Sequence, residues 1–307
     1  MLEKTVLEYQ SIASHFYKNR IRGELTPRNL IRALEQSAHH YRPNYFRRLK
    51  NAIRIDQESK GFKKTAKLVS EIQNPVTCGE GGLAGLLEPK EKQPRVKNVS
   101  QADFIKLASA AKDKKDRALL AAIKIAYTLG CRPAEMETIQ FLGGNTVNIV
   151  GAKKIEDENG TGRGLDRQVL LSSEIYANLQ LWSRDLLRLE HKKSGRMTLL
   201  QGRLKNLTKK VFPRRKKQIS FYSFRHQKGS DLKASGMSRV EIAYLMGHQS
   251  TESIEVYGNR RSGSRMVVPI EAAISVAEIS KLVRSNHRQP PSQYKKIIIN
   301  NENTKKR

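Results

Sequence analysis

The chain has 307 residues, and its 58 Lys and Arg against 29 Asp and Glu give a net charge of +29. This length suits two domains, each with its own core, and the excess of cations predicts a polyanion, nucleic acid, as the partner. A membrane-spanning segment is excluded, since no stretch reaches the ~18 consecutive apolar residues that it needs, and the N-terminus lacks a signal-peptide core. The two cysteines, Cys78 and Cys131, fit neither a disulfide framework nor a zinc site, so we expect a reduced, cytoplasmic protein.

The N-terminal part of the chain carries apolar side chains at helical spacing. The three stretches with this spacing are residues 5–17, 26–38 and 43–57. Because Thr26 and Asn44 have side chains typical of helix starts, we expect residues 1–73 to form a small helical domain. The aromatic side chains expected in its core are Tyr41, Tyr45 and Phe46, and the cations expected to contact DNA are Arg42, Arg47, Arg48 and Lys50.

Residues 74–99 show no sustained period and contain several prolines and glycines, which indicates a linker between domains. Helical spacing then resumes at Ser100, a typical N-cap, and continues to Gly130, a residue that often ends helices. This spacing predicts one helix from Ser100 to Gly130.

Two stretches of the second part, residues 146–150 and 167–171, have the composition of β-strands. They flank a turn region that contains Asn159 and Gly160, which predicts an antiparallel pair. Further helices follow, among them one that carries Trp182. The predicted fold class is mainly α with a small antiparallel β-sheet.

Arg132 lies at a predicted junction between two helices. Gly130 ends the first helix, and Pro133 fits the first position of the next. Free backbone N–H groups and the helix dipole favour an anion at such a junction, so the Arg132 guanidinium is well placed to bind a phosphate.

Further along the chain we expect a helix that begins near Arg225, and a second helix, capped by Ser238, that ends at Gly247. This glycine allows His248 and Tyr257, the latter on a third helix, to leave the backbone from different elements and to share a site. On one unbroken helix they would face opposite sides. From the residues alone, Tyr257 is a core aromatic, a base-stacking platform or a nucleophile.

In this order the residues resemble the motifs of the tyrosine recombinases, also called the phage-integrase family. "TLGCRPAE" (128–135) resembles the first arginine box, and "YSFRH" (222–226) resembles the second. "MGH" (246–248) and Tyr257 resemble the last part of the pattern. The resemblance covers roughly residues 100–260 and implies a helical core-binding domain followed by an α+β catalytic domain. The N-terminal segment resembles the core-binding domain in size and character only.

The resemblance implies that Tyr257 is the nucleophile and that Arg132, Arg225 and His248 hold the scissile phosphate by charge-assisted hydrogen bonds. The product would be a 3′-phosphotyrosyl intermediate. Because the covalent link conserves the bond energy of the phosphodiester, no ATP is needed, and because the cationic side chains stabilise the transition state, no metal or other cofactor is expected.

The family keeps a general acid, a lysine, on a β-hairpin, and Lys153 and Lys154 are both candidates for it. Glu135 and His226 match supporting positions. The chain departs from the family at Tyr222, where a histidine is usual. A phenol can donate a hydrogen bond to a phosphate, but with a pKa of about 10 it is a poor proton acceptor.

The sequence therefore predicts a site-specific DNA recombinase that integrates, excises or resolves DNA of a mobile genetic element. The expected partners are double-stranded DNA and further copies of the chain, as a tetramer on DNA. Two alternatives are a topoisomerase IB-like nicking and closing enzyme and a sequence-specific DNA-binding relative that no longer cuts.

We expect the catalytic domain to span residues 100–265 and a C-terminal helix with a basic tail to span residues 266–307. The helix is either packed on its own domain or docked on a neighbouring subunit. The apolar residues expected to share one face of it are Ile270, Ile274, Ala277 and Val283.

Overall fold

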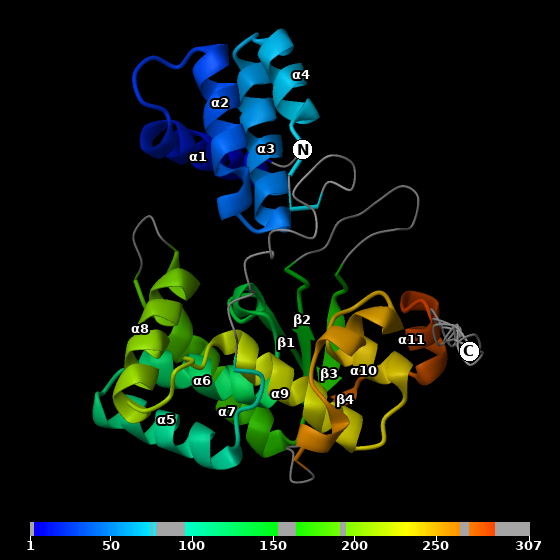
Figure 1. Cartoon of the computed structure of the whole chain (residues 1–307). Coiled ribbons are helices and arrows are strands. Elements are labelled where there is room, and N and C mark those ends of the chain that lie inside the picture. The colour runs from blue at the N-terminus through cyan, green and yellow to red at the C-terminus, as the bar shows by residue number, and fades with distance from the viewer. Residues whose placement is uncertain are drawn as a thin grey trace, which may run out of the picture. The chain divides into compact units, whose positions relative to one another are not determined.

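The computed structural model describes residues 3–74, 76–77, 96–152, 164–190, 195–264 and 270–285. The chain divides into two compact units, Met1–Gln93 and Pro94–Arg307, here called unit 1 and unit 2 (Figure 1). In these described ranges, no helix combines the length and the apolar character needed to cross a membrane.

Unit 1 is a helical bundle. It contains α1 (Glu3–Arg20), α2 (Pro27–Ser37), the 3₁₀ helix η1 (Ala38–His40), α3 (Pro43–Ser59) and α4 (Lys63–Glu71). The Thr26 hydroxyl caps α2, as predicted, by accepting a hydrogen bond from the Asn29 amide at 3.2 Å. Helix α3 begins at Pro43 rather than at Asn44, because a proline suits the first helical position, where no N–H partner is needed.

The aromatic side chains of α3 correct one prediction. Phe46 is buried in the core of unit 1, but Tyr45 is 40 % exposed and Tyr41 is half-buried. The inner face of α3 is occupied by Phe46, Leu49 and Ile53, which follow helical spacing, and Tyr45 falls outside this face.

Unit 2 is mainly helical. Its α-helices are α5 (Gln101–Asp113), α6 (Arg117–Leu129), α7 (Ser173–Leu187), α8 (Arg196–Val211), α9 (Phe221–Ala234), α10 (Arg239–Leu245) and α11 (Val276–Leu282). The central helix is α6, which packs against α5, α7, α8 and α9 and is buried along most of its length.

A four-stranded antiparallel sheet completes unit 2, so the predicted fold class is confirmed. Its strands are β1 (Ile139–Gly143), β2 (Thr146–Ile149), β3 (Arg167–Leu170) and β4 (Glu271–Ala272), in that order across the sheet. The predicted β2–β3 pair is present, with Val147 opposite Val169. The turn expected at Asn159 and Gly160 lies outside the described residues.

The helix predicted from Ser100 to Gly130 is broken in the middle. Ser100 does cap α5, and Gly130 ends α6 in the left-handed conformation with φ of 61°. Between them Lys115 has a φ of 54°, and the Asp116 carboxylate caps α6 and forms a 3.1 Å ion pair with Arg203. The prediction of one helix was wrong because this tertiary pair favours a second cap over helix continuation.

The helices that carry the motif residues begin and end partly where they were predicted to. Helix α9 begins at Phe221, so Arg225 lies one turn inside it rather than at its entry. Ser238 caps α10, as predicted, and Gly247 follows that helix with a φ of 64°. Tyr257 is not on a third helix, because it directly follows a six-residue 3₁₀ helix, η3 (Thr251–Val256).

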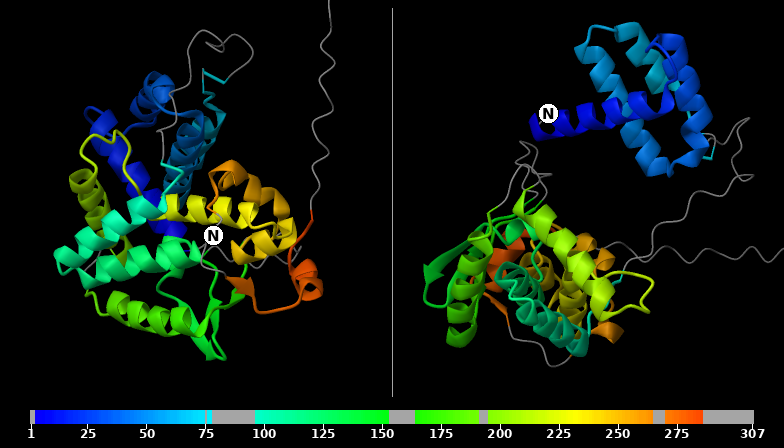
Figure 2. Two further views of the ribbon diagram at one scale, coloured as in Figure 1. Left: turned by 90° about the horizontal axis from the view of Figure 1, so that it is seen from below. Right: turned by 90° about the vertical axis from the view of Figure 1, so that its left-hand side faces the viewer.

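The segment after Tyr257 packs on its own unit. Strand β4 pairs with β3, and α11 packs against α10 (Figure 1 and Figure 2). Of the residues predicted to share an apolar face, Ile270 and Val283 are buried and Ile274 is half-buried. Ala277 is exposed, and Ile279 lies in the core instead. The helix is shorter than expected, because β4 takes its first residues. Docking on a neighbouring subunit stays a prediction.

Candidate active site

Side chains from five segments of unit 2 form one cluster. Arg132 follows α6 and is the N-cap of the 3₁₀ helix η2 (Pro133–Glu135). Arg167 begins β3, and Arg225 projects from α9. His248 follows α10, and Tyr257 follows η3. The three arginines and His248 are buried.

The carboxylate of Glu135 organises the cluster. It is fully buried and accepts hydrogen bonds from the Arg132 amide at 2.8 Å and from the Arg132 guanidinium at 2.5 Å. The Arg132 guanidinium also donates to the Gly247 carbonyl at 3.3 Å. The side chain of Arg132 is therefore held between the end of α6 and the turn after α10.

Arg167 is the site residue that sequence reasoning missed. It is 1 % exposed, and its Nη2 donates to Glu135 Oε2 at 2.8 Å. Although burial alone would raise the pKa of Glu135, Arg167 and then the other two arginines lower it to about 2. The sequence pattern of β3 could have indicated this residue. Arg167 and Val169 are two residues apart and therefore lie on the same, buried face of the strand, where a cation needs a partner.

Arg225 connects three parts of the cluster. Its Nη1 donates to the Gly130 carbonyl at 3.0 Å, and its Nη2 donates to the Met246 carbonyl and lies 2.9 Å from His248 Nε2. Burial and the neighbouring arginines lower the pKa of Arg225 to about 10. The guanidinium is therefore still charged at neutral pH.

His248 is neutral in this arrangement. A guanidinium has no acceptor, so Nε2 of His248 accepts the bond from Arg225 and the ring carries its proton on Nδ1. Burial and then the three guanidiniums lower the pKa of His248 to about 2, against the opposing charge of Glu135. Nδ1 is buried without a hydrogen-bond partner among the described residues.

The ring of Tyr257 lies at the edge of the cluster and is half-buried. Its centroid is 4.9 Å from Arg225 Cζ, 5.2 Å from the His248 ring and 5.0 Å from the His226 ring. The rings of His248 and Tyr257 therefore lie side by side, as predicted from their separate positions in the chain.

The cluster has an excess of buried positive charge. Three guanidiniums face one carboxylate and a neutral imidazole, and Nε of Arg225 together with Nε and Nη1 of Arg167 have no partners in the described part of the chain. Buried cations without counter-charges are costly, so the cluster is suited to bind an anion. Within the described ranges no three His, Cys, Asp or Glu side chains could together hold a metal ion.

Two other predicted residues lie next to the cluster, and two cannot be placed. Tyr222 is 37 % exposed, one helical turn before Arg225. His226 is buried and packs against Tyr257. Lys153 and Lys154 lie outside the described residues.

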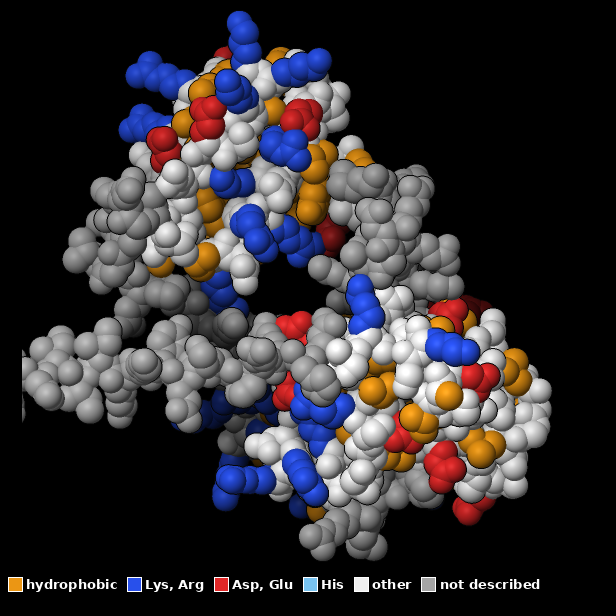
Figure 3. Space-filling model, turned by 90° about the vertical axis from the view of Figure 1, so that its right-hand side faces the viewer, with side chains coloured by type: hydrophobic (Ala, Val, Ile, Leu, Met, Phe, Trp, Pro, Cys, Tyr) orange, Lys and Arg blue, Asp and Glu red, His pale blue; other side chains and the backbone are white. Residues whose placement is uncertain are grey.

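The cations predicted to contact DNA in unit 1 differ in their surroundings. Arg47 is exposed, Arg42 is half-buried, and Arg48 forms an ion pair with Glu8 on the surface. Lys50 is half-buried and donates to the carbonyls of Ser70 and Ile72 at the end of α4. Lys50 therefore has a structural role in the free protein. Lys and Arg side chains are spread over the helices of unit 1 on the face drawn in Figure 3.

No protein-family model matches the sequence, and no curated protein is similar enough in sequence to be counted as a relative. Solved structures match it in fold. The chain is similar to "Tn1549 transposon Integrase (aa 82-397) in complex with circular intermediate DNA", with 13 % identity over 84 % of this chain and 90 % of that one and a TM-score of 0.54. It is also similar to "a lambda integrase tetramer bound to a Holliday junction", with 12 % identity over 88 % and 75 % of the two chains and a TM-score of 0.52. The chain thus has the tyrosine recombinase fold.

Proposed function

We propose that the chain is a site-specific DNA recombinase that cuts and rejoins strands through a covalent bond between Tyr257 and DNA. The observation that carries the proposal is the buried excess of positive charge beside the Tyr257 ring. A phosphodiester has one negative charge, and its pentacoordinate transition state has more. The cluster therefore complements the transition state better than the ground state, which is the condition for catalysis.

In the proposed complex Arg132 and Arg225 donate hydrogen bonds to the non-bridging oxygens of the scissile phosphate. His248 adds a neutral donor. Glu135 and Arg167 hold these groups in place from inside the unit. Removal of one preorganised donor of this kind typically costs about 10²-fold or more in rate, so we expect Arg132→Ala and Arg225→Ala each to slow cleavage by at least that factor.

As the Tyr257 phenol gives up its proton to solvent water, its oxygen attacks phosphorus, and the bond between phosphorus and the 5′ oxygen breaks. The leaving oxygen takes a proton, for which Lys153 or Lys154 is the proposed donor. The guanidinium of Arg225 lies 4.9 Å from the centroid of the Tyr257 ring, so the proposed nucleophile and the cationic cluster share one site. The new bond to phosphorus replaces the old one, so rejoining needs no ATP, and guanidiniums supply the positive charge that metal ions supply elsewhere.

The proposed substrate is double-stranded DNA, bound by both units. The net charge of +29 supports this, and two of the fold neighbours were solved as DNA complexes. One of them is a tetramer on a Holliday junction, so we propose a tetramer on DNA for this chain as well.

A DNA-binding relative that no longer cuts is the second candidate. It is favoured by one observation, the exposed phenol of Tyr222 at the position where the family has histidine. A nicking and closing enzyme would use the same site chemistry without strand exchange.

The deciding experiment expresses the protein beside its own locus and sequences the joined DNA junctions that appear. The junction sequence then supplies a duplex with a nick next to the cut site, which traps the covalent intermediate. A recombinase gives junctions and a protein–DNA adduct, and Tyr257→Phe gives neither while DNA affinity is kept. Relaxation of supercoiled DNA without junctions would indicate the nicking and closing enzyme, and specific binding without an adduct would indicate the inactive relative.

A further inference from the structure

Helix α9 carries a second row of buried polar side chains beside the face that bears Arg225. Gln227, Ser230 and Asp231 are 6 %, 0 % and 5 % exposed. Their spacing of three and four residues places them on one side of the helix. This row contacts residues 258–264, which directly follow Tyr257.

Three hydrogen bonds join the row to segment 258–264. They run from Gln227 Nε2 to the Ser262 carbonyl at 3.0 Å, from the Asn259 amide to Ser230 Oγ at 3.0 Å, and from the Ser264 amide to Asp231 Oδ1 at 2.8 Å. Gln227 Nε2 also donates to Asp231 Oδ1 at 2.8 Å, so two of the three bonds depend on each other.

The backbone of the segment touches the backbone of α9. A Cβ atom on Gly258 would lie 2.3 Å from the Ser230 nitrogen, and one on Gly263 would lie 2.4 Å from the Ser230 carbonyl oxygen. Tyr257 itself sits over Gly229, where an added Cβ would be 3.2 Å from that of Tyr257. The backbone directly after Tyr257 is therefore held against α9.

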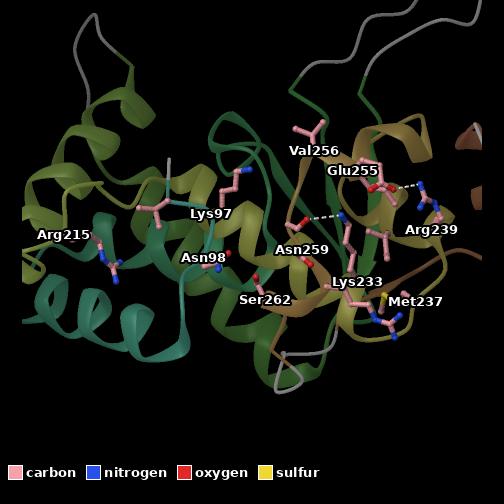
Figure 4. A pocket seen from close by; sticks show the side chains of 15 residues that line it. Lys97, Asn98, Arg215, Lys233, Met237, Arg239, Glu255, Val256, Asn259 and Ser262 are labelled. Carbon is pink, nitrogen blue, oxygen red and sulfur yellow. Dashed lines mark hydrogen bonds and ion pairs between the residues drawn. The ribbon is translucent and has the colours of Figure 1, made fainter. Parts of the chain in front are cut away.

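The other end of the Gln227 side chain reaches the end of the predicted linker. Its Oε1 accepts a hydrogen bond from the Val99 amide at 3.0 Å. A cavity of about 1050 Å³ lies near this contact, and its lining includes Lys97, Asn98, Asn259 and Ser262 (Figure 4). Gln227 therefore bonds both Ser262, which lines this cavity, and Val99, which follows the lining residue Asn98.

We propose that Gln227 is a positioning residue for Tyr257. Its amide nitrogen holds segment 258–264 on α9, and its amide oxygen ties the same segment to the end of the linker. A displacement of residues 96–99 therefore reaches the nucleophile through one side chain. The inference rests on the proposed function, in which Tyr257 attacks phosphorus.

The first test compares Gln227→Leu, which removes all three hydrogen bonds of the Gln227 side chain at similar volume, with Gln201→Leu on α8 as the matched control. Because misplacement of a reacting group by about 1 Å can cost about 10²-fold, we expect single-turnover cleavage by Gln227→Leu to fall about 10- to 100-fold. DNA affinity and the rate of the control stay at the parent level. An unchanged cleavage rate would overturn the proposal.

A second arm separates positioning from general damage. In a Tyr257→Ala background hydrogen peroxide replaces the phenol as the nucleophile. A peroxide oxygen loses its proton and attacks phosphorus, and the bond from phosphorus to the 5′ oxygen breaks. The 5′ oxygen takes up a proton and leaves as a hydroxyl. This reaction uses the arginines but not the tyrosine segment. We expect Gln227→Leu to leave the peroxide reaction unchanged, and an equal loss in both reactions would show that Gln227 only supports the whole cluster.

Hydrogen exchange tests whether Gln227 holds segment 258–264 on α9, and it needs no measurement of DNA cleavage. In Gln227→Leu the amides of Asn259 and Ser264 should exchange at least about tenfold faster than in the parent, while the Gly247 amide, bonded to the Tyr244 carbonyl, keeps its protection. Unchanged exchange at both amides would refute the attachment. If the parent does not cleave DNA, the proposed function fails, and this measurement still decides whether Gln227 holds segment 258–264 on α9.

Gln227→Glu separates the two ends of the side chain. A carboxylate still accepts from the Val99 amide, but it cannot donate to the Ser262 carbonyl and it repels Asp231. We expect cleavage as slow as in Gln227→Leu, with the Val99 amide still protected. A parent-like rate would show that the bond to Ser262 does not position Tyr257.

Discussion

The neutral state of His248 makes the stability of unit 2 depend on pH. A histidine in an unfolded chain has a pKa of about 6.5. In the folded protein burial and the neighbouring guanidiniums lower the pKa of His248 to about 2. Below about pH 6.5 the unfolded state therefore binds a proton that the folded state does not, and stability falls as the pH falls.

The size of this effect follows from the unfolded pKa. Between about pH 7 and about pH 5 the linkage lowers the free energy of unfolding by about 2 kcal/mol. The result does not depend on how far below 5 the folded pKa lies, since the folded state stays unprotonated over the whole interval. Above about pH 7 the effect disappears.

The assay is denaturant unfolding of the parent and of His248→Gln at both pH values. The glutamine oxygen can accept the hydrogen bond that Arg225 donates to His248, and it does not titrate. The single tryptophan, Trp182 on α7, reports on unit 2 alone. Because the remaining histidines are common to both proteins, the parent should lose about 2 kcal/mol more than the variant. Equal losses would refute the neutral His248.

Glu135→Gln removes the carboxylate between the buried arginines, so the free energy of unfolding, measured by tryptophan fluorescence, should fall by about 3–5 kcal/mol; a loss under about 1 kcal/mol would contradict the ion-pair cluster. Gly258→Ala and Gly236→Ala both place a side chain at positive φ, with 68° and 87°, but only the first brings a methyl group against Ser230. Thermal unfolding should show a loss of about 1 kcal/mol for Gly236→Ala and about 1–3 kcal/mol more for Gly258→Ala, and equal losses would argue against the close backbone contact. Tyr222→Phe should unfold within about 0.5 kcal/mol of the parent but cleave more slowly in a single turnover, with Tyr222→His restoring the rate. Parent-like cleavage by Tyr222→Phe would mean that its phenol does not donate to the phosphate.

Sequence reasoning worked where one residue type determines the local backbone. Thr26, Ser100 and Ser238 cap helices as predicted, and Gly130 ends α6. These caps depend on a side chain and an amide only a few residues away, so the signal is local. The order of the motifs, together with the resemblance that they carry, pointed to the residues that the structure brings into one cluster.

Tertiary partners explain most of what the sequence did not predict. From the sequence alone, Arg167 cannot be told apart from an arginine on the exposed face of a strand. Its burial depends on the ion pair with Glu135, which is distant in sequence. The break at Lys115 depends on an ion pair between Asp116 and a distant helix. The two-residue strand β4 is defined by backbone pairing with β3 and by no pattern of its own. The role inferred for Gln227 likewise needs a partner far away in sequence, Val99.

The late position of β4 in the chain has a consequence for protein synthesis. Strand β3 is covered on one side by β2, but its other edge is covered by β4, about a hundred residues later. At about 5–20 residues per second, a ribosome delivers β4 about 5 to 20 s after β3. During this interval the edge of β3 has unpaired backbone groups, the feature that invites pairing with other chains. Unit 1, whose helices all precede it and have their own core, can fold earlier, so the nascent chain most needs protection from aggregation between the synthesis of β3 and that of β4.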